Sequence, residues 1–252
     1  MRRLLAAVSL LLLSACASST VPAGMAIHYV KSNLDGSKPS LVTIYFAGPD
    51  TIEVSKSEKD LIDSADITAH IDWSRLTADD IDAGVLLATG EREKRAALTI
   101  RGNELQVKLG DAEETLSVDT FPLHVYNFDL MSLNAVLPRL EAHTFRFAVA
   151  EPTFGAKPGV MELRGFAEAE YVGTETLRGV LTRKYRVGGK GMAGAVGWLW
   201  INDEDGYMET WESPLANNPG WNSLRLERRG VSSMTAAEWQ AYKVRNVGVG
   251  VP

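Results

Sequence analysis

The pattern that decides the fold is an alternation of apolar and polar residues, which reads AALTIRGNELQVKL over residues 96–109. Leu98 and Ile100 share one face of the first predicted strand, and three apolar residues share one face of the second. Gly102 and Asn103 lie between the two runs, and these residue types favour the positive φ angles of a tight turn. The segment therefore predicts an antiparallel β-hairpin.

Short alternating segments of this kind, separated by Gly, Asn, Asp and Pro, dominate the chain. The further predicted strands are Ala26–Val30, Leu41–Ala47, Thr51–Lys56, Thr115–Asp119, Thr144–Ala150, Val160–Val172, Leu181–Val187, Val196–Asn202, Tyr207–Glu212 and Ser223–Arg228. Because the strands are sequential and the links are short, we expect an antiparallel sheet with one apolar face. A sheet this wide has to curl, or helices have to cover it. We therefore expect a mostly β fold, a half-barrel or barrel-like curved sheet with one or two covering helices.

Two segments are predicted to be helical. Residues 127–140 carry leucines at helical spacing, and residues 235–245 begin with Thr235 and Glu238 at the spacing of a capping box. Residues 74–82 fit either a third helix or a solvated acidic loop.

The amino-terminal residues read as an export signal. Arg2 and Arg3 precede an apolar run, Leu4–Leu13, that is too short for an ordinary bilayer span of about 20 residues. The tetrapeptide at residues 13–16 resembles the lipobox of bacterial lipoproteins, which implies acylation of Cys16. The alternative is a standard signal peptide with an incidental cysteine.

These features predict a lipoprotein signal peptide over 1–15, a flexible tether over 16–24, and a single β domain over 25–252. Removal of Arg2 and Arg3 would change the formal charge from −6 to −8, so attraction to anionic lipid would not assist the acyl anchor. In proteobacterial lipoproteins an aspartate after the cysteine retains the protein at the inner membrane. Ala17 stands there instead, so we expect the outer membrane, with the domain facing the periplasm.

Composition excludes several classes of function. The acidic balance, 26 Lys and Arg against 32 Asp and Glu, provides no general attraction for nucleic acid. One cysteine and four scattered histidines do not form a recognisable metal motif, and we expect neither a metal nor a cofactor. The acidic run at residues 202–206 reads as a hairpin turn in preference to a calcium loop.

The later strands resemble those of envelope proteins with a lipoprotein-carrier-like (Lol-type) half-barrel. The residues that carry the likeness are 171–176, 182–187, 198–203, 207–212 and 224–227. The likeness covers Glu170 to Arg228 and includes no catalytic motif. It implies a curved antiparallel sheet whose apolar concave face can hold acyl chains.

Aromatic residues on these strands are the candidate ligand contacts, with core packing as the alternative interpretation. They are Phe145, Phe147, Tyr185, Trp198, Trp200 and Trp211. No nucleophile motif occurs, so no catalytic residue is predicted and we expect no enzyme activity.

The first hypothesis is a membrane-anchored, non-catalytic lipoprotein that binds or shields a lipid or another hydrophobic molecule in the periplasm. The second is an envelope module that binds another protein. A hydrolase such as an esterase is the third, since a catalytic triad is recognised by geometry and not by sequence position.

Overall fold

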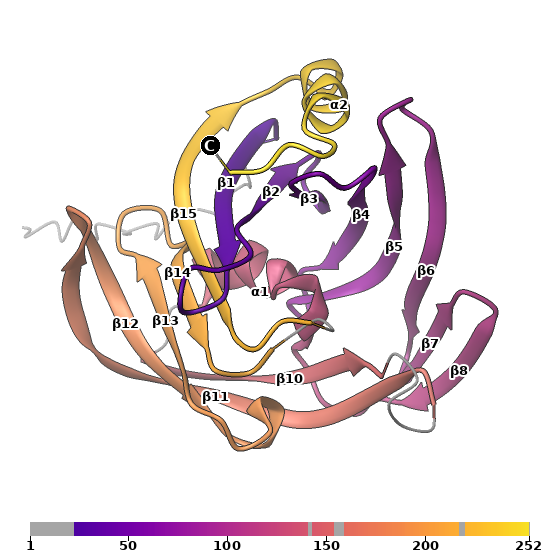
Figure 1. Cartoon of the computed structure of the whole chain (residues 1–252). Coiled ribbons are helices and arrows are strands. Elements are labelled where there is room, and N and C mark those ends of the chain that lie inside the picture. Colours follow the sequence, from indigo (N-terminus) through magenta and orange to yellow (C-terminus); the bar gives the residue numbers. More distant parts are fainter. Residues whose placement is uncertain (1–22, 141–142, 154–158, 217–219, 252) are drawn as a thin grey trace, which may run out of the picture.

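One continuous fifteen-stranded sheet forms the body of the protein in a computed structural model that describes residues 23–140, 143–153, 159–216 and 220–251 (Figure 1). The strands are β1 (Met25–Ser32), β2 (Ser40–Phe46), β3 (Thr51–Glu58), β4 (Asp63–Asp72), β5 (Thr77–Leu87), β6 (Arg92–Arg101), β7 (Glu104–Leu109), β8 (Ala112–Ser117), β9 (Leu123–Val125), β10 (Thr144–Pro152), β11 (Met161–Leu177), β12 (Val180–Gly188), β13 (Gly197–Asn202), β14 (Met208–Ser213) and β15 (Leu224–Ser233). The α-helices are α1 (Met131–Val136) and α2 (Ala236–Arg245), and the 3₁₀ helices are η1 (Tyr126–Phe128), η2 (Leu137–Arg139) and η3 (Lys190–Met192).

Strand order follows the chain in two runs that meet at the middle of the sheet. The order is β8 through β1, then β15 down to β9, so the first strand pairs with the last. Met25 lies opposite Ser233 in this antiparallel pair. All neighbouring strands are antiparallel except β9 and β10. The curved, mostly β architecture with two α-helices confirms the predicted fold class.

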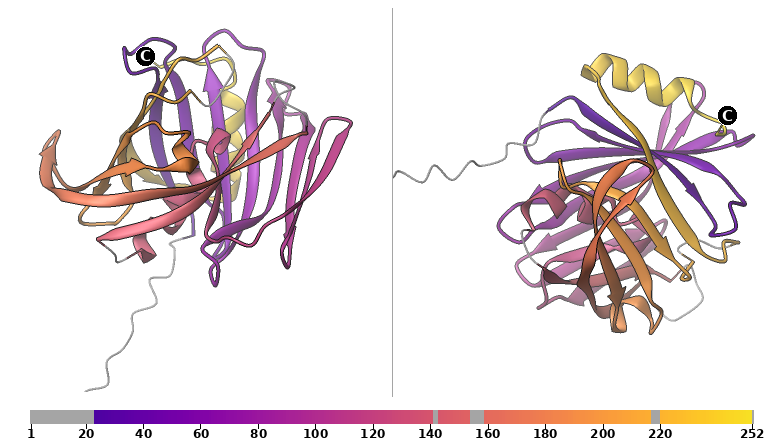
Figure 2. Two further views of the ribbon diagram at one scale, coloured as in Figure 1. Left: turned by 90° about the horizontal axis from the view of Figure 1, so that it is seen from below. Right: turned by 90° about the vertical axis from the view of Figure 1, so that its left-hand side faces the viewer.

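The sheet curves around α1, which lies on its inner side (Figures 1 and 2). The two end regions of the sheet approach each other where Glu114 of β8 contacts the start of β11. Its Oε2 accepts hydrogen bonds from the backbone N–H groups of Val160 and Met161, at 2.7 and 3.1 Å, where β11 begins. A second contact joins Thr77 Oγ1 of β5 to the N–H of Leu123 of β9 at 2.9 Å. These contacts enclose the apolar face.

The second helix, α2, packs on the outer side of the sheet. The Trp239 ring stacks on Tyr45 with ring centroids 4.9 Å apart. Lys243 Nζ contacts Glu53 Oε2 and Asp66 Oδ1, each at 2.8 Å. The predicted capping box is present, since Thr235 and Glu238 exchange hydrogen bonds at the start of the helix. None of the helices in the described ranges is long and apolar enough to span a membrane.

The predicted hairpin over residues 96–109 is confirmed. Arg101 pairs with Glu104 across the turn, and Gly102 has a positive φ of 60°. The helix predicted over residues 127–140 is shorter than expected. Only Met131–Val136 is α-helical, because Asp129 and Leu130 both adopt left-handed backbone angles just before it.

Two strands, β4 and β5, were missed in the sequence analysis, and in both of them acidic residues interrupt the alternation of apolar and polar residues. Neither the helix nor the loop considered for residues 74–82 is correct, because β5 begins at Thr77. Acidic residues are uncommon in strands. Here Asp66 of β4 and Asp82 of β5 face outward and both contact Arg92, with N–O distances of 2.8 and 2.5 Å. The short strand β9 was also missed.

Candidate functional site

The six aromatic residues predicted to contact a ligand divide between the two faces of the sheet. Phe147, Tyr185 and Trp211 are each 1% exposed and belong to the main core. Phe145 is also in that core. Trp198 and Trp200 lie on the opposite face, because the intervening Leu199 is the residue of β13 that enters the core. The structure therefore does not bring all six together.

The inner aromatic residues form a row across β10, β11 and β12. The centroid distances are 6.2 Å from Phe147 to Phe145, 5.4 Å from Phe145 to Tyr185, and 5.7 Å from Tyr185 to Tyr171. Tyr171 is partly exposed and lies next to the exposed His143. The row thus extends from the buried interior to the rim of the sheet.

The outer tryptophans belong to a separate polar surface. Lys184 Nζ lies 5.0 Å from the Trp198 ring centroid and 4.9 Å from that of Trp200. The indole N–H of Trp200 donates a hydrogen bond to Glu175. These contacts place Trp198 and Trp200 away from the interior.

The interior is filled by residues 126–139, which comprise η1, α1 and η2 and which we call the plug. Its apolar side chains from Tyr126 to Leu137 are almost completely buried. A cavity of about 10 Å³ remains beside Ser132 of the plug, with Ile81 and Leu98 among its walls. This volume accommodates at most about one water molecule. The inner face is therefore occupied by the protein's own side chains in this state.

Asn134 fixes the plug to two strands. Its Nδ2 donates to the Tyr29 hydroxyl at 2.9 Å, and its Oδ1 accepts from the N–H of Met208 at 2.8 Å. The Tyr29 hydroxyl in turn donates to the carbonyl oxygen of Met208 at 2.8 Å. Because these groups are buried, each hydrogen bond also avoids the cost of an unpaired polar group.

An ionic contact fixes the beginning of the plug. The Asp129 carboxylate lies between two lysines of the sheet, with Oδ1 3.0 Å from Lys31 Nζ and Oδ2 2.7 Å from Lys56 Nζ. Lys56 Nζ also donates to the carbonyl oxygen of Asn127 at 2.9 Å. Burial alone would raise the pKa of Asp129, but attraction to the two lysines outweighs it and lowers the pKa to about 2. Burial lowers the pKa of Lys56.

Glu151 and Arg164 lie beside this contact. Burial raises the pKa of Glu151 to about 8, although Arg164 and Lys56 act in the opposite direction. Glu151 Oε2 lies 4.0 Å from Arg164 Nη1, and neither atom has a hydrogen-bond partner among the described residues. We call Lys31, Lys56, Asp129, Glu151 and Arg164 the buried ionic cluster. With Glu151 largely protonated near neutral pH, the cluster contains more positive than negative charge.

The backbone at the start of the plug is strained. Asp129 and Leu130 have φ angles of 53° and 54°. A left-handed conformation costs roughly 1–2 kcal/mol for an ordinary L-residue, and it is rare for one as bulky as leucine. Sites that retain such strain are often sites of function. In this conformation the Asp129 carboxylate contacts both Lys31 and Lys56.

Neither His70 nor His124 forms a serine–histidine–carboxylate triad in the described residues. His124 Nδ1 lies 3.0 Å from Ser132 Oγ, but its Nε2 has no hydrogen-bond partner there. Burial lowers the pKa of His124 to about 3. Both ring nitrogens of His70 contact carboxylates, those of Asp79 and Asp50, at 2.6 and 3.2 Å. Groups of three or more metal-ligating side chains are not found in the same ranges.

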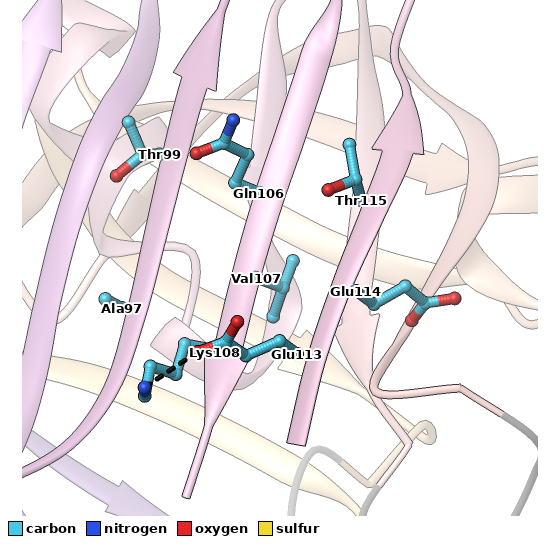
Figure 3. A pocket seen from close by; sticks show the side chains of 8 residues that line it. All are labelled: Ala97, Thr99, Gln106, Val107, Lys108, Glu113, Glu114 and Thr115. Carbon is cyan, nitrogen blue, oxygen red and sulfur yellow. Dashed lines mark hydrogen bonds and ion pairs between the residues drawn. The ribbon is translucent and has the colours of Figure 1, made fainter. Parts of the chain in front are cut away.

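A surface hollow of about 420 Å³ lies over β6, β7 and β8 (Figure 3). Its side chains are mostly polar, and Lys108 Nζ lies 2.7 Å from Glu113 Oε1 within it. Glu114 extends away from the others in Figure 3, in keeping with its contacts to β11. The hollow lacks the apolar walls that a lipid chain requires.

The buried ionic cluster was missed in the sequence analysis, although the positions of its two lysines in the sequence give an indication of it. Lys31 follows Ile27 and Tyr29 at spacings of two, and Lys56 likewise follows Val54. Each lysine is therefore placed on the apolar face of its strand. A lysine on the apolar face of a strand needs a buried partner, so its position in the sequence indicates a buried polar contact. Cys16 lies outside the described residues.

No model of a known protein family matches the chain, and no curated protein sequence does either. Solved structures with similarity include a β-barrel-like DUF1849 protein from Brucella abortus, with 8% identity over 84% of this chain and 98% of that one, at a TM-score of 0.46. A LolA superfamily protein from Nitrosomonas europaea is 9% identical over 84% of each chain, at a TM-score of 0.27. A domain of a lipoprotein-sorting protein from Vibrio parahaemolyticus is 8% identical over 84% of this chain and 86% of that one, at 0.25. These neighbours include the Lol-type group that the later strands resemble.

Proposed function

We propose that the protein is a lipid-anchored, non-catalytic protein of the bacterial cell envelope that binds a lipid or another apolar molecule. Its binding surface is the inner face of the curved sheet, and the plug occupies that surface when no ligand is bound. The observation that carries the proposal is how the apolar face of the sheet is covered. A short segment, residues 126–139, packs against this extended face without being a strand of the sheet itself.

The attachment of the plug is consistent with displacement. Its polar side-chain contacts with the strands are made by a few residues, which include Asn134, Asp129, Tyr126 and Ser132. Strain at Asp129 and Leu130 lowers the cost of releasing this segment. The inner aromatic row provides a path for a chain, because Tyr171 at the rim is partly exposed and leads to Tyr185. A lipid chain that replaced the plug would regain apolar contacts with the sheet, at about 0.8 kcal/mol for each methylene group buried.

The test uses chain from which residues 1–15 and Cys16 have been removed, freed of lipid by organic extraction and refolded. Uptake of a fluorescent fatty acid is measured by titration, and the bound mass is identified by native mass spectrometry. We expect saturable binding of one ligand. Asn134→Ala should bind more tightly because it weakens the plug, whereas the exposed Gln106→Ala on β7 should match the unaltered chain. Absence of uptake by all three folded proteins would refute the proposal.

Anchoring is tested separately in cells. We expect Cys16→Ser to abolish incorporation of labelled palmitate and to move the protein from the membrane fraction to the soluble fraction. Incorporation that persists in this variant would contradict acylation at Cys16. Separation of inner from outer membranes on a density gradient then tests the expected outer-membrane location.

An envelope scaffold is the second candidate, favoured by the filled interior and by the partly exposed Trp198 on the outer face. A photocrosslinking residue at position 198 should then capture one specific envelope protein in cells. Diffuse products, equal to those from a crosslinker at the exposed position 106, would count against this candidate.

A further inference from the structure

The central contact of the buried ionic cluster joins two different parts of the molecule. Lys31 belongs to β1 and Lys56 to β3, so both ammonium groups are fixed by the sheet. Asp129 belongs to the plug. Displacement of the plug would therefore remove the carboxylate and leave both lysines on the inner face.

Two lysines that lose the Asp129 carboxylate in this environment would favour another anion in its place. The Lys31 and Lys56 side chains are 3% and 14% exposed, and the guanidinium of Arg164 lies in the same cluster. Removing one partner of a buried ion pair is strongly destabilising, because the remaining charge is poorly solvated. A neutral apolar ligand would bring no anion to the lysines, whereas a ligand with its own anionic group would replace the Asp129 carboxylate.

The lysines also lie at one end of apolar tracks. On β1 the residues that share the face of Lys31 are Tyr29 and Ile27, and on β3 those that share the face of Lys56 are Val54 and Ile52. Four residues of strand extend about 13 Å. The inner face thus presents positive charge at one end and an apolar strip beyond it, which is complementary to an amphiphile with an anionic head and an alkyl chain.

The head group is further defined by the manner in which Asp129 is held. Its two oxygens are divided between the two lysines, at 3.0 and 2.7 Å, so the spacing of the ammonium groups suits a planar carboxylate. The centroid of the Trp221 ring lies 4.5 Å from Lys31 Nζ, so this ring also borders the site of the carboxylate.

From these observations we infer that the ligand is a long-chain fatty acid, whose carboxylate replaces that of Asp129 between Lys31 and Lys56. The inference rests on the proposed function, and it adds the chemical class of the ligand. In this arrangement the Asp129 carboxylate is an internal substitute for the ligand's head group, and release of the plug and capture of the fatty acid exchange one anion for another.

The test compares palmitate, hexadecanol and hexadecyl phosphate, which share an alkyl chain and differ in the head group. Affinities are measured by calorimetry on the delipidated chain without residues 1–16. We expect palmitate to bind at least about tenfold more tightly than hexadecanol, because hydrogen bonds to charged groups are stronger than those between neutral groups. Hexadecyl phosphate should bind more weakly than palmitate.

The variant that isolates the lysines is Lys31→Met/Lys56→Met/Asp129→Asn, which leaves no unpaired charge from the original contact. We expect its palmitate-to-hexadecanol preference to fall to about one, with hexadecanol still bound. Lys108→Met, on the exposed surface of β7, is the matched control and should retain the preference. The use of a ratio separates head-group recognition from any general loosening of the plug.

The outcomes distinguish the inference from the function on which it rests. Equal binding of palmitate and hexadecanol, or a preference that survives in the triple variant, would overturn the inference and leave apolar-ligand binding intact. Binding of hexadecyl phosphate as tight as that of palmitate would overturn the carboxylate assignment. Failure of every ligand to bind the folded chain would refute the proposed function itself.

Discussion

The side chain of Asn134 and the hydroxyl of Tyr29 lie 2.9 Å apart inside the curved sheet, and their contact joins α1 to β1. The side-chain oxygen of Asn134 accepts a hydrogen bond from the N–H of Met208 in β14, so one residue connects the plug to β1 and to β14, which lie on either side of β15.

Replacement of Asn134 by alanine should therefore destabilise the protein. The variant leaves the buried N–H of Met208 without this acceptor, and we expect a loss of about 1–3 kcal/mol in the free energy of unfolding. Urea denaturation followed by circular dichroism measures the change. Gln106→Ala, whose side chain is exposed, should unfold at the same urea concentration as the unaltered chain. Coincident transitions for both variants would show that Asn134 does not stabilise the plug.

Glu151 should make stability depend on pH. Its pKa is about 8 in the folded protein against an ordinary value of 4.5, so the folded state binds more protons between these values. Its contribution to stability is therefore greatest at low pH and is lost as pH rises from about 4.5 to 8. Glu151→Gln removes this dependence. Between pH 5 and pH 8 we expect the stability of the variant to improve, relative to the unaltered chain, by an amount on the order of 2–3 kcal/mol.

Urea titrations of both proteins at several pH values measure this difference, and the comparison cancels the effects of other titrating groups. A constant difference across the range would mean that Glu151 is ionised throughout. A difference that grew in favour of the unaltered chain at higher pH would contradict the sign of the predicted shift.

His70 and His124 should titrate at very different pH values. Burial lowers the pKa of His124 to about 3, whereas the hydrogen bond that the His70 ring donates to the Asp79 carboxylate raises the pKa of His70 from its ordinary value of 6.5. Ring signals followed by NMR from pH 8 to pH 5 should therefore shift for His70 and stay constant for His124. Because His124 is neutral when folded, its contribution to stability is lost as pH falls from about 6.5 toward 3. A His124 signal that titrates near pH 6.5 would contradict its burial.

Glu114 should hold the two ends of the sheet together. Glu114→Ala removes the acceptor for the N–H groups of Val160 and Met161, and we expect faster hydrogen exchange at both amides. We expect the free energy of unfolding to fall by about 1–3 kcal/mol, because the lost acceptor is charged. Glu113→Ala is the control, because the neighbouring Glu113 contacts only the exposed Lys108 in the described hydrogen bonds. Equal exchange in both variants would show that the ends of the sheet are held in another way.

Features set by residues close together in the chain could be predicted from the sequence. The turn at Gly102 and the cap at Thr235 depend on the conformational preferences of a few adjacent residues, and both are present. The alternation of Leu105 and Val107 likewise identified the face that enters the core.

Features set by distant partners could not be predicted. Asp66 is tolerated in β4 because Lys243 and Arg92 reach it from α2 and β6. Asp129 is tolerated in the interior because Lys31 and Lys56 meet it there, although they come much earlier in the chain. Alternation gives the face of a strand on which a side chain lies, but it does not give the oppositely charged residue that the folded chain places beside it.

The pairing of β1 with β15 has a consequence for the order of folding. One edge of β1 (residues 25–32) pairs only with β15 (residues 224–233). During synthesis from the amino end, this edge of the first run of strands therefore stays unpaired until residues 224–233 have been made. The sheet edges β8 and β9, by contrast, are joined by a short link in the middle of the chain. A circular permutant that began at β9 and ended at β8 would convert this latest pairing into a local one, and it would be expected to fold faster.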